Sequence, residues 1–486
     1  MAVTEPPETI FGPTKRGLTI SVMATIAVIA YNNLGMSAAL PEIGNDLGDV
    51  SLLPWSISVE LLTSGVAVLA AGPLVDGIGA RRVFRWSVSG FAVTSALCGL
   101  APSMAALVAA RALQGIAAGM LLTVTMVAIG VSYEAGARAR VFAWNSTVWG
   151  VTSVAGPSIA AVMVATVGWR GVFYLSVPVS LIAALLAWNA LPEAADDAAS
   201  VPADARGIAI IAVIASAGLA VAEGSVTALG LGSVFVLLGV FAYRAHAARS
   251  ADPVVRPRHL FADRFRSVHT TSLLAVGGAL GFHAFLPVYL RGARGMSTTA
   301  AAFSVVYLSV GWTTGAITAS RLQDKMMREK VVLLGSVFLA SGLPITTTAV
   351  FTEAPLPVLV IGLAITGLGV GSMSTTGINV LQERATIAEM GRLNAAHQFM
   401  RTMSITYGVG IAGAVIVTTV DRRTGDVEAV RDLLGGDVDT VGADVADALA
   451  AGFEYALLVA CVAGLLAIPA ALHLVRTHDE AVTSAA

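Results

Sequence analysis

The feature that most constrains this chain is a succession of long apolar stretches separated by short polar ones. A helix needs about 20 mostly apolar residues to cross the hydrocarbon core of a bilayer. Fourteen stretches qualify as candidate spans, and their repetition predicts an all-α polytopic membrane protein. The candidates are about 18–41, 53–75, 83–101, 104–131, 141–166, 172–191, 207–224, 227–247, 268–290, 297–320, 331–351, 355–381, 393–420 and 451–475.

The composition agrees with a chain whose solvent is lipid. Apolar residues make up 56% and charged residues 12% of the sequence, and the mean hydropathy is +0.80, which would leave a soluble protein too little polar surface. The formal charge is -2, and the basic residues are spread over many loops rather than gathered on one face, so no nucleic-acid partner is expected. Cys98 and Cys461 lie in apolar stretches without metal-ligand spacing, so neither a disulfide framework nor a metal site is predicted.

The distribution of Lys and Arg predicts the orientation. An even number of spans places both termini on one side, and with the N-terminus inside, the cytoplasmic loops hold about twenty of the 29 basic residues. We therefore expect a multi-pass protein of the inner (plasma) membrane with both termini in the cytoplasm.

The order of the stretches predicts a division into six plus two plus six spans. The expected parts are a cytoplasmic N-terminus at 1–17, an N-terminal six-helix bundle at 18–191, cytoplasmic linkers and an additional helix pair at 192–267 (spans about 207–224 and 227–247), a C-terminal six-helix bundle at 268–475 with an acidic outer loop at 421–450, and a cytoplasmic tail at 476–486.

A short charged turn at 72–82 follows the second span. Its glycines allow two helix ends to approach closely, and a carboxylate there can accept hydrogen bonds from a helix end or an arginine. The pattern resembles motif A of the major facilitator superfamily of transporters, which implies a conformational latch. The alternative is a positively charged loop without special meaning. The pattern consists of Gly72, Leu74, Asp76, Gly79, Arg81 and Arg82.

Further segments resemble the same superfamily. Residues 111–115 are similar to motif B, Gly156 and Pro157 to the core of the antiporter motif C, and 321–328 to a degraded copy of motif A. The resemblance narrows to the fourteen-span branch of drug:proton antiporters, which includes the quaternary-ammonium exporters. It implies two six-helix bundles plus a two-helix insertion. The chain departs from the branch at Asn32, where relatives commonly carry an acid.

Glu60 is the carboxylate placed well within a span, on a polar stripe with Ser56 at helical spacing. A charge near the bilayer centre costs roughly 2.5–3.5 kcal/mol, so we expect Glu60 to bind the coupled proton, unless it reaches the outer surface or pairs with a neighbouring helix. Arg111 is the matching cation, and Gln114 lies on its face. His283 is a second candidate for proton coupling.

Other polar and aromatic residues at span positions are predicted to line a substrate cavity, with helix packing as the alternative. The antiporter-motif helix is expected at Gly150, Gly156 and Pro157. The cavity residues are Asn32, Asn33, Ser56, Gln114, Asn145, Trp149, Trp312, Thr375, Asn379 and Gln398; Asn394, His397 and Arg401 are softer candidates.

Three function classes fit the chain to different degrees. Proton-coupled export of amphipathic or cationic compounds is expected first, export of one dedicated metabolite or lipid second, and a polytopic membrane enzyme last, because the in-span polar groups are scattered. Residues 408–413 match G-x-G-x-x-G but lie inside an apolar stretch, so no nucleotide cofactor is expected. The expected partners are the lipid bilayer, a small amphipathic substrate and protons, and the protein is expected to be a monomer that is not an enzyme.

Overall fold

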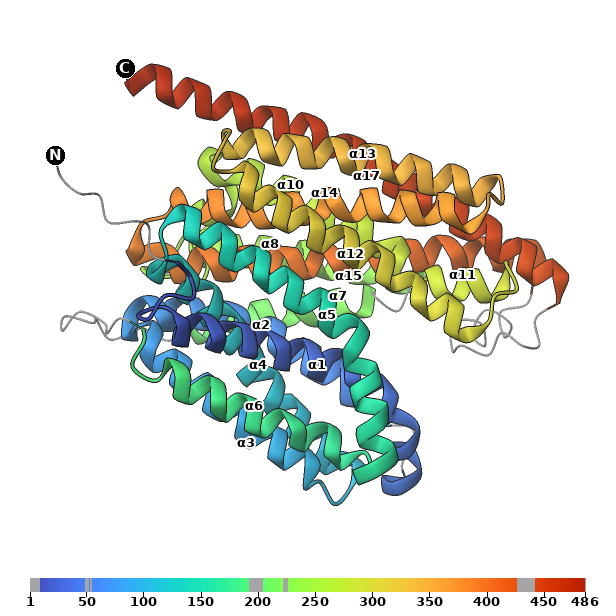
Figure 1. Ribbon diagram of the computed structural model, residues 1–486, viewed down its shortest axis with the longest axis horizontal. Coiled ribbons are helices and arrows are strands. Elements are labelled where there is room, and N and C mark those ends of the chain that lie inside the picture. The colour runs from blue at the N-terminus through green and yellow to red at the C-terminus, as the bar shows by residue number, and fades with distance from the viewer. Residues whose placement is uncertain are drawn as a thin grey trace. The chain divides into compact units, whose positions relative to one another are not determined.

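The computed structural model describes residues 9–48, 52, 55–191, 204–221, 226–425 and 442–485, and these ranges contain helices and no strand (Figure 1). The helices are α1 (Arg16–Leu47), α2 (Trp55–Ile78), α3 (Ala80–Gly99), α4 (Met104–Ser132), α5 (Ala135–Val167), α6 (Arg170–Ala187), α7 (Ala205–Val221), α8 (Val226–Ala247), α9 (Arg258–Phe261), α10 (Asp263–His283), α11 (Leu286–Gly292), α12 (Thr298–Leu322), α13 (Arg328–Phe351), α14 (Leu356–Glu383), the 3₁₀ turn η2 (Ile387–Glu389), α15 (Met390–Thr424) and α17 (Ala443–Ala485).

The chain forms two compact units with the same pattern of helix pairing. The first unit comprises Met1–Ala203 and Ala385–Ala395, and the second comprises Asp204–Arg384 and Ala396–Ala486. In the first, α4 packs against α2 and α3, and α6 packs against α3 and α1. In the second, α14 packs against α12 and α13, and α17 packs against α13 and α10. The repeated order indicates two structurally related halves.

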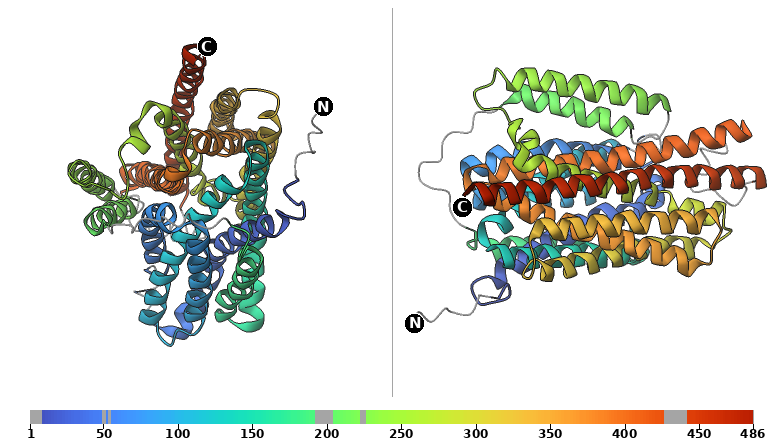
Figure 2. Two further views of the ribbon diagram at one scale, coloured as in Figure 1. Left: turned by 90° about the vertical axis from the view of Figure 1, so that its left-hand side faces the viewer. Right: turned by 90° about the horizontal axis from the view of Figure 1, so that it is seen from above.

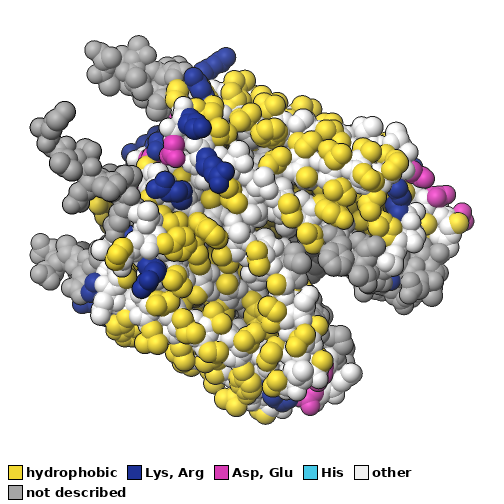
Figure 3. All heavy atoms as spheres, in the orientation of Figure 1, with side chains coloured by type: hydrophobic (Ala, Val, Ile, Leu, Met, Phe, Trp, Pro, Cys, Tyr) yellow, Lys and Arg dark blue, Asp and Glu magenta, His cyan; other side chains and the backbone are white. Residues whose placement is uncertain are grey.

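Nine helices in the described part of the chain are long and apolar enough to cross a membrane, and the bent helix α5 brings the number to ten. Hydrophobic side chains cover most of the helix surfaces visible in Figure 3, whereas Lys and Arg gather near helix ends. Leu185 and Phe241, for example, are 75% and 71% exposed. Such surfaces are stable in contact with lipid. The number of fourteen spans stays a prediction.

Two sequence predictions differ from the structure in detail. The turn expected at 72–82 is almost entirely helical, because α2 continues to Ile78 and α3 begins at Ala80, and only Gly79, with φ of 88°, breaks the helix. The span expected at 268–290 corresponds to one candidate span, Asp263–Gly292, but its helix is interrupted at Ala284 and Phe285, between α10 and α11, ahead of a proline in the first turn of α11. Proline lacks the amide hydrogen that a continuous helix would need there.

Several predicted features lie outside the described residues. They are the start of the N-terminus at 1–8, the acidic linker at 192–203, the end of the seventh candidate span at 222–224, and most of the acidic outer loop, at 426–441.

A single carboxylate joins the helix pair α7 and α8, which lie side by side in Figure 2, to the connector that follows them. Asp204 accepts hydrogen bonds from the amides of Gly207 (2.9 Å) and Val254 (3.0 Å), and its Oδ1 lies 2.6 Å from Nε2 of His246. Burial acts to raise the pKa of Asp204, but the bonds from Val254, Gly207 and His246 outweigh it, so the pKa is lowered overall.

We predict that Asp204→Asn lowers the free energy of unfolding by about 1.5–3 kcal/mol near neutral pH, as for a hydrogen-bonded charge. Because folding lowers the pKa of Asp204 below its unfolded value of about 3.9, this contribution is complete above that value and is lost as the pH falls through the folded-state pKa. The melting temperatures of wild type and variant in detergent should therefore converge below about pH 4.

The control is Asp263→Asn, which removes an exposed pair with Arg266 (3.1 Å) and should change the melting temperature little at any pH. A wild-type margin over Asp204→Asn that persists undiminished to pH 3 would contradict the prediction.

Candidate functional site

A buried ion pair connects α2 and α4 in the first unit. Nη2 of Arg111 lies 3.6 Å from Oε2 of Glu60, and the two side chains are 1% and 3% exposed. The in-span acid and the in-span cation are therefore paired between two helices, which is also the arrangement expected if Glu60 has a structural role, and Glu60 does not reach the surface. Two opposite charges at this depth neutralise each other in a medium that would otherwise oppose both.

Arg111 is held by neutral oxygen atoms as well as by the carboxylate. Its Nε donates to the Ser56 carbonyl at 2.8 Å, and its Nη1 donates to Oε1 of Gln114 at 2.7 Å. The contact with Glu60 is longer than the 2.7–2.9 Å of a charge-assisted hydrogen bond. Arg111 would consequently keep two hydrogen bonds if Glu60 were protonated, so the geometry permits a change of charge at Glu60.

Gln114 extends the network to α1 and α3. Its Nε2 donates hydrogen bonds to Oγ of Ser95 at 2.8 Å and to Oδ1 of Asn32 at 3.3 Å. Its Oε1 also accepts a hydrogen bond from the thiol of Cys98 at 3.5 Å. Three of the predicted cavity residues, Asn32, Ser56 and Gln114, thus meet around Arg111. Ser95 and Cys98 complete the network, and their residue types alone carry no signal for that role.

The close approach of α2 to α4 depends on the glycine that follows Gln114. A Cβ atom at Gly115 would lie 2.1 Å from Oγ1 of Thr63 and 2.4 Å from the Glu60 carbonyl oxygen. These distances are far below a van der Waals contact, so a larger residue would separate the two helices. Glycine at this position therefore sets the distance between the helices that carry Glu60 and Arg111.

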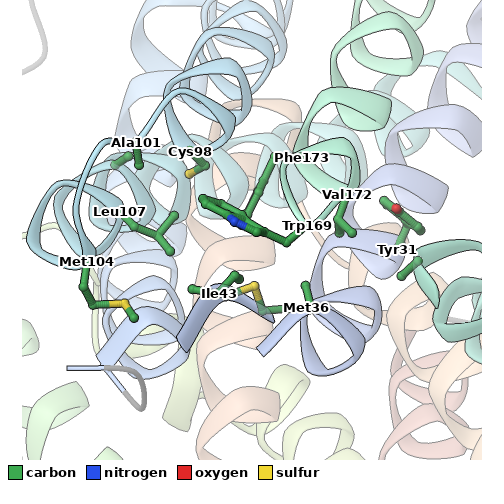
Figure 4. Close-up of a cluster of buried hydrophobic side chains, with 13 residues drawn as sticks. Tyr31, Met36, Ile43, Cys98, Ala101, Met104, Leu107, Trp169, Val172 and Phe173 are labelled. Atoms are coloured by element: carbon green, nitrogen blue, oxygen red, sulfur yellow. The ribbon is translucent and has the colours of Figure 1, made fainter. Parts of the chain in front are cut away.

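An apolar cluster covers one side of the network. The Phe173 ring centroid lies 6.0 Å from Cζ of Arg111, and Trp169 packs edge-on against Phe173 with a centroid separation of 6.0 Å. Figure 4 shows the two rings among side chains that include Leu107 and Cys98, all buried. The cluster keeps water from this side of the ion pair, which strengthens the attraction between the charges.

Asp76, from the motif A pattern, accepts two backbone hydrogen bonds. Its Oδ1 binds the amide of Gly391 at 2.6 Å and its Oδ2 the amide of Arg392 at 3.0 Å, at the first residues of α15. The segment 385–395 packs as part of the first unit. A carboxylate at a helix N-terminus neutralises free amide groups and the positive end of the helix dipole.

The other motif A residues shape this contact. A Cβ at Gly72 would lie 2.9 Å from the Arg392 Cα, so Gly72 permits the approach. Gly79 provides the positive φ between α2 and α3. Arg81 donates to the carbonyl groups of Asn189 and Leu191 after α6, and Arg82 is exposed.

The antiporter-motif helix α5 is bent. Its parts Ala135–Ser153 and Ala155–Val167 meet at 44°, between Gly150 and the pair Gly156 and Pro157. A proline removes the hydrogen bond to the residue four positions earlier, here Ser153, which accounts for the bend. Asn145, on the same helix, is buried, and neither amide atom has a hydrogen-bond partner among the described residues.

Not every predicted cavity residue joins a polar cluster. Asn33 and Trp149 are exposed on α1 and α5. In the second unit, Nδ2 of Asn379 donates a hydrogen bond to Oε1 of Gln323 at 2.7 Å. Thr375 and Gln398 are buried as well.

His283 is buried at the end of α10. Its Nε2 has no hydrogen-bond partner in the part of the chain that the structure describes. Its predicted coupling role stays a prediction.

A histidine pair in the second unit was only half anticipated. Nδ1 of His269 on α10 lies 3.2 Å from Nδ1 of His397 on α15, and Nε2 of His269 lies 2.9 Å from the His259 carbonyl oxygen. Because that oxygen requires a donor, neutral His269 carries its hydrogen on Nε2 and accepts from His397. His397 is a predicted candidate, whereas His269, near the polar start of its helix, carries no sequence signal.

Comparison with known proteins places these features in a family context. A family model described as the Major Facilitator Superfamily matches residues 20–409. The multidrug transporter protein MdtP of Bacillus subtilis is 28% identical over 412 residues, covering 83% of this chain and 75% of that protein. The multidrug efflux pump SdrM of Staphylococcus aureus is 25% identical over 408 residues, covering 81% of this chain and 89% of that protein.

A structural neighbour supports the fold. The crystal structure of a bacterial homologue of the iron transporter ferroportin in an outward-facing state matches with a TM-score of 0.65 at 13% identity, covering 95% of this chain and 100% of that one. At this identity the likeness concerns the fold alone. Together with the apolar helices, the matches establish a multi-pass membrane protein.

We predict that Arg111→Gln lowers the free energy of unfolding by about 3–5 kcal/mol, because it leaves the Glu60 carboxylate buried without its counter-charge. Adding Glu60→Gln should restore part of that loss, because the buried charge is then gone. Chemical unfolding of the wild type, both single variants and the double variant in detergent measures the coupling. A double variant whose loss equals the sum of the single losses would show that the two side chains do not interact.

Proposed function

The chain belongs to the major facilitator superfamily, and on that premise we propose that it is a secondary active transporter that exports amphipathic or cationic drug-like compounds by proton antiport. The multidrug transporter and efflux pump that it resembles support the substrate class. The observation that carries the proposal is the buried pair of Glu60 and Arg111 inside the first unit.

Glu60 is proposed to bind the coupled proton. Its carboxylate faces Arg111 at 3.6 Å, while the guanidinium keeps its bonds to Ser56 and Gln114, so protonation of Glu60 leaves the arginine anchored. Arg111 stays charged at any relevant pH and favours the ionised carboxylate. Proton uptake and release at Glu60 would therefore require a change in its distance from Arg111 or in its access to water, which alternating access supplies.

The energetics are sufficient for export. One proton moving through about 100 mV gains roughly 2.3 kcal/mol, and one pH unit adds about 1.4 kcal/mol. The total of about 3.7 kcal/mol would hold a neutral solute at a concentration ratio of several hundred.

The membrane arrangement belongs to the same proposal. Fourteen spans, with α7 and α8 as an additional pair between two six-helix bundles, would place both termini in the cytoplasm and the protein in the inner membrane as a monomer. The helix α5, which is already bent near Gly150, Gly156 and Pro157, would change its bend during transport. The predicted residues Asn32, Asn145, Trp312, Thr375 and Gln398 are proposed to line the substrate path.

The contact of Asp76 with the start of α15 is proposed to latch the outward-open form, with Gly72, Gly79, Arg81 and Arg82 shaping the latch. The described residues of the second half show no equivalent contact. Asp324, in the degraded copy of the motif, is exposed and has no hydrogen bond or ion pair among the described residues. A latch on one half favours one of the two alternating states.

We predict that Glu60→Gln abolishes pH-driven transport. Proteoliposomes with an imposed pH gradient and a fluorescent lipophilic cation measure movement against the cation gradient, with the exposed Glu134→Gln as the control that retains it. Undiminished transport by Glu60→Gln would mean that the coupled proton binds at another residue, with His283 as the first candidate. If the wild type moves no cation, export of one dedicated metabolite or lipid becomes the better proposal.

We predict that Asp76→Asn slows transport about tenfold or more while leaving substrate affinity within a few-fold, because it removes one charged acceptor at the helix end, worth about 1.5–3 kcal/mol. Asp324→Asn is the matched control and should transport like the wild type. Initial efflux rates and equilibrium binding in the same preparations provide the two readouts. Equal rates for Asp76→Asn and Asp324→Asn would exclude the latch.

A further inference from the structure

Two side chains in the second unit form a cluster that the proposed proton chemistry does not use. Cζ of Arg401 on α15 lies 5.6 Å from the centroid of the Trp312 ring on α12. Both side chains are half-buried, so the pair retains an accessible face. Both residues lie eight positions from an end of their candidate spans, 393–420 and 297–320, which corresponds to a depth of roughly 12 Å in each helix.

Arg401 has no counter-ion among the residues that the structure describes. Within the described part of the chain it has no acidic residue at ion-pair distance and no hydrogen bond, and its buried Nε has no acceptor. Arg111 in the first unit differs in each respect, with Glu60 at 3.6 Å and two neutral acceptors. A cation that has no acidic partner among the described residues is costly inside a membrane span and therefore indicates a function.

The surroundings of Arg401 reinforce its positive charge. The nearest titratable group on α15 is His397, one turn earlier, which faces His269 on α10 rather than an acid. Trp312, from α12, offers the negative face of its ring and no formal charge. The contact holds the guanidinium against an aromatic surface and leaves its planar fork of donors available to an anion.

We infer that Trp312 and Arg401 form a subsite for the carboxylate of an aromatic substrate. The carboxylate would take the missing hydrogen bonds of the guanidinium, and the substrate ring would pack on the indole. The inference rests on the proposed export function and extends it, because the substrate range then includes aromatic carboxylates as well as cations.

The test compares three ligands that share a naphthalene ring and differ in charge: 2-naphthoate, neutral 2-naphthamide and the cation (2-naphthylmethyl)trimethylammonium. Isothermal titration of the purified full-length protein in detergent, without any ion gradient, measures each affinity. The wild type should bind naphthoate at least tenfold more tightly than naphthamide. Arg401→Gln should abolish this preference while retaining naphthamide binding, which also shows that the variant is folded, and Arg401→Lys should keep part of it.

Two further variants keep the test decisive. Trp312→Leu should weaken naphthoate and naphthamide alike, because it removes the packing surface and leaves the charge. Arg422→Gln, which removes an exposed cation at the far end of α15, should bind all three ligands like the wild type. If Arg401→Gln misfolds, the affinities of Trp312→Leu and the preference of the wild type for naphthoate over naphthamide still test the proposed subsite.

Equal affinity of the wild type for naphthoate and naphthamide, or an unchanged preference in Arg401→Gln, would overturn the subsite. Either result would leave proton-driven efflux of lipophilic cations intact. Conversely, absence of proton-driven efflux would not alter equilibrium binding of naphthoate, so failure of the export proposal is distinguishable from failure of the subsite.

Discussion

A charge inside a bilayer has no water around it, so an ionised side chain in a membrane span has to find its partners within the protein. In the first unit, the guanidinium of Arg111 meets that requirement with an acid, a carbonyl and an amide side chain. The partners come from two helices, and Gln114 extends the bonding to two more. The arrangement of α1 to α4 therefore depends on one buried cation, and the glycine at 115 brings α2 close enough to serve it.

The second unit repeats the helix pairing without repeating this chemistry. Among the described residues, its polar pairs inside the candidate spans, such as Gln323 with Asn379 and His269 with His397, are neutral, whereas an ion pair such as Arg384 with Glu329 lies at helix ends. Arg401 is the exception, because its compensation within the described residues is an aromatic face. Duplication of a packing pattern thus leaves each half free to acquire a different electrostatic role, a buried ion pair in one and a half-buried cation against an aromatic ring in the other.

The sequence predicted the features that follow from local composition. Apolar runs near 20 residues predict helices, and an in-span acid with an in-span arginine predicts an ion pair, because neither charge is tolerated without compensation. The match to the family model confirms the superfamily resemblance. The sites of the coupled proton and of the substrate stay predictions.

Other features could not be predicted, since they depend on backbone groups or on distant neighbours. The partners of Asp76 are main-chain amides, which every residue except proline has, so no residue type marks them. The pairing of His269 with His397 needs two helices 128 residues apart in sequence to pack face to face. The sequence cannot show that no described acid lies at ion-pair distance from Arg401, because this depends on which side chains the fold brings to the guanidinium.

The bonds between Asp76 and the start of α15 also impose an order on biogenesis. The two amide donors lie 315 and 316 residues after the carboxylate that they bind. A ribosome that adds about 5–20 residues per second needs roughly 15 s to 1 min to reach them. Throughout that interval α2 exists without these two donors. The first unit, although encoded first, therefore attains its final set of hydrogen bonds only when most of the protein has been made.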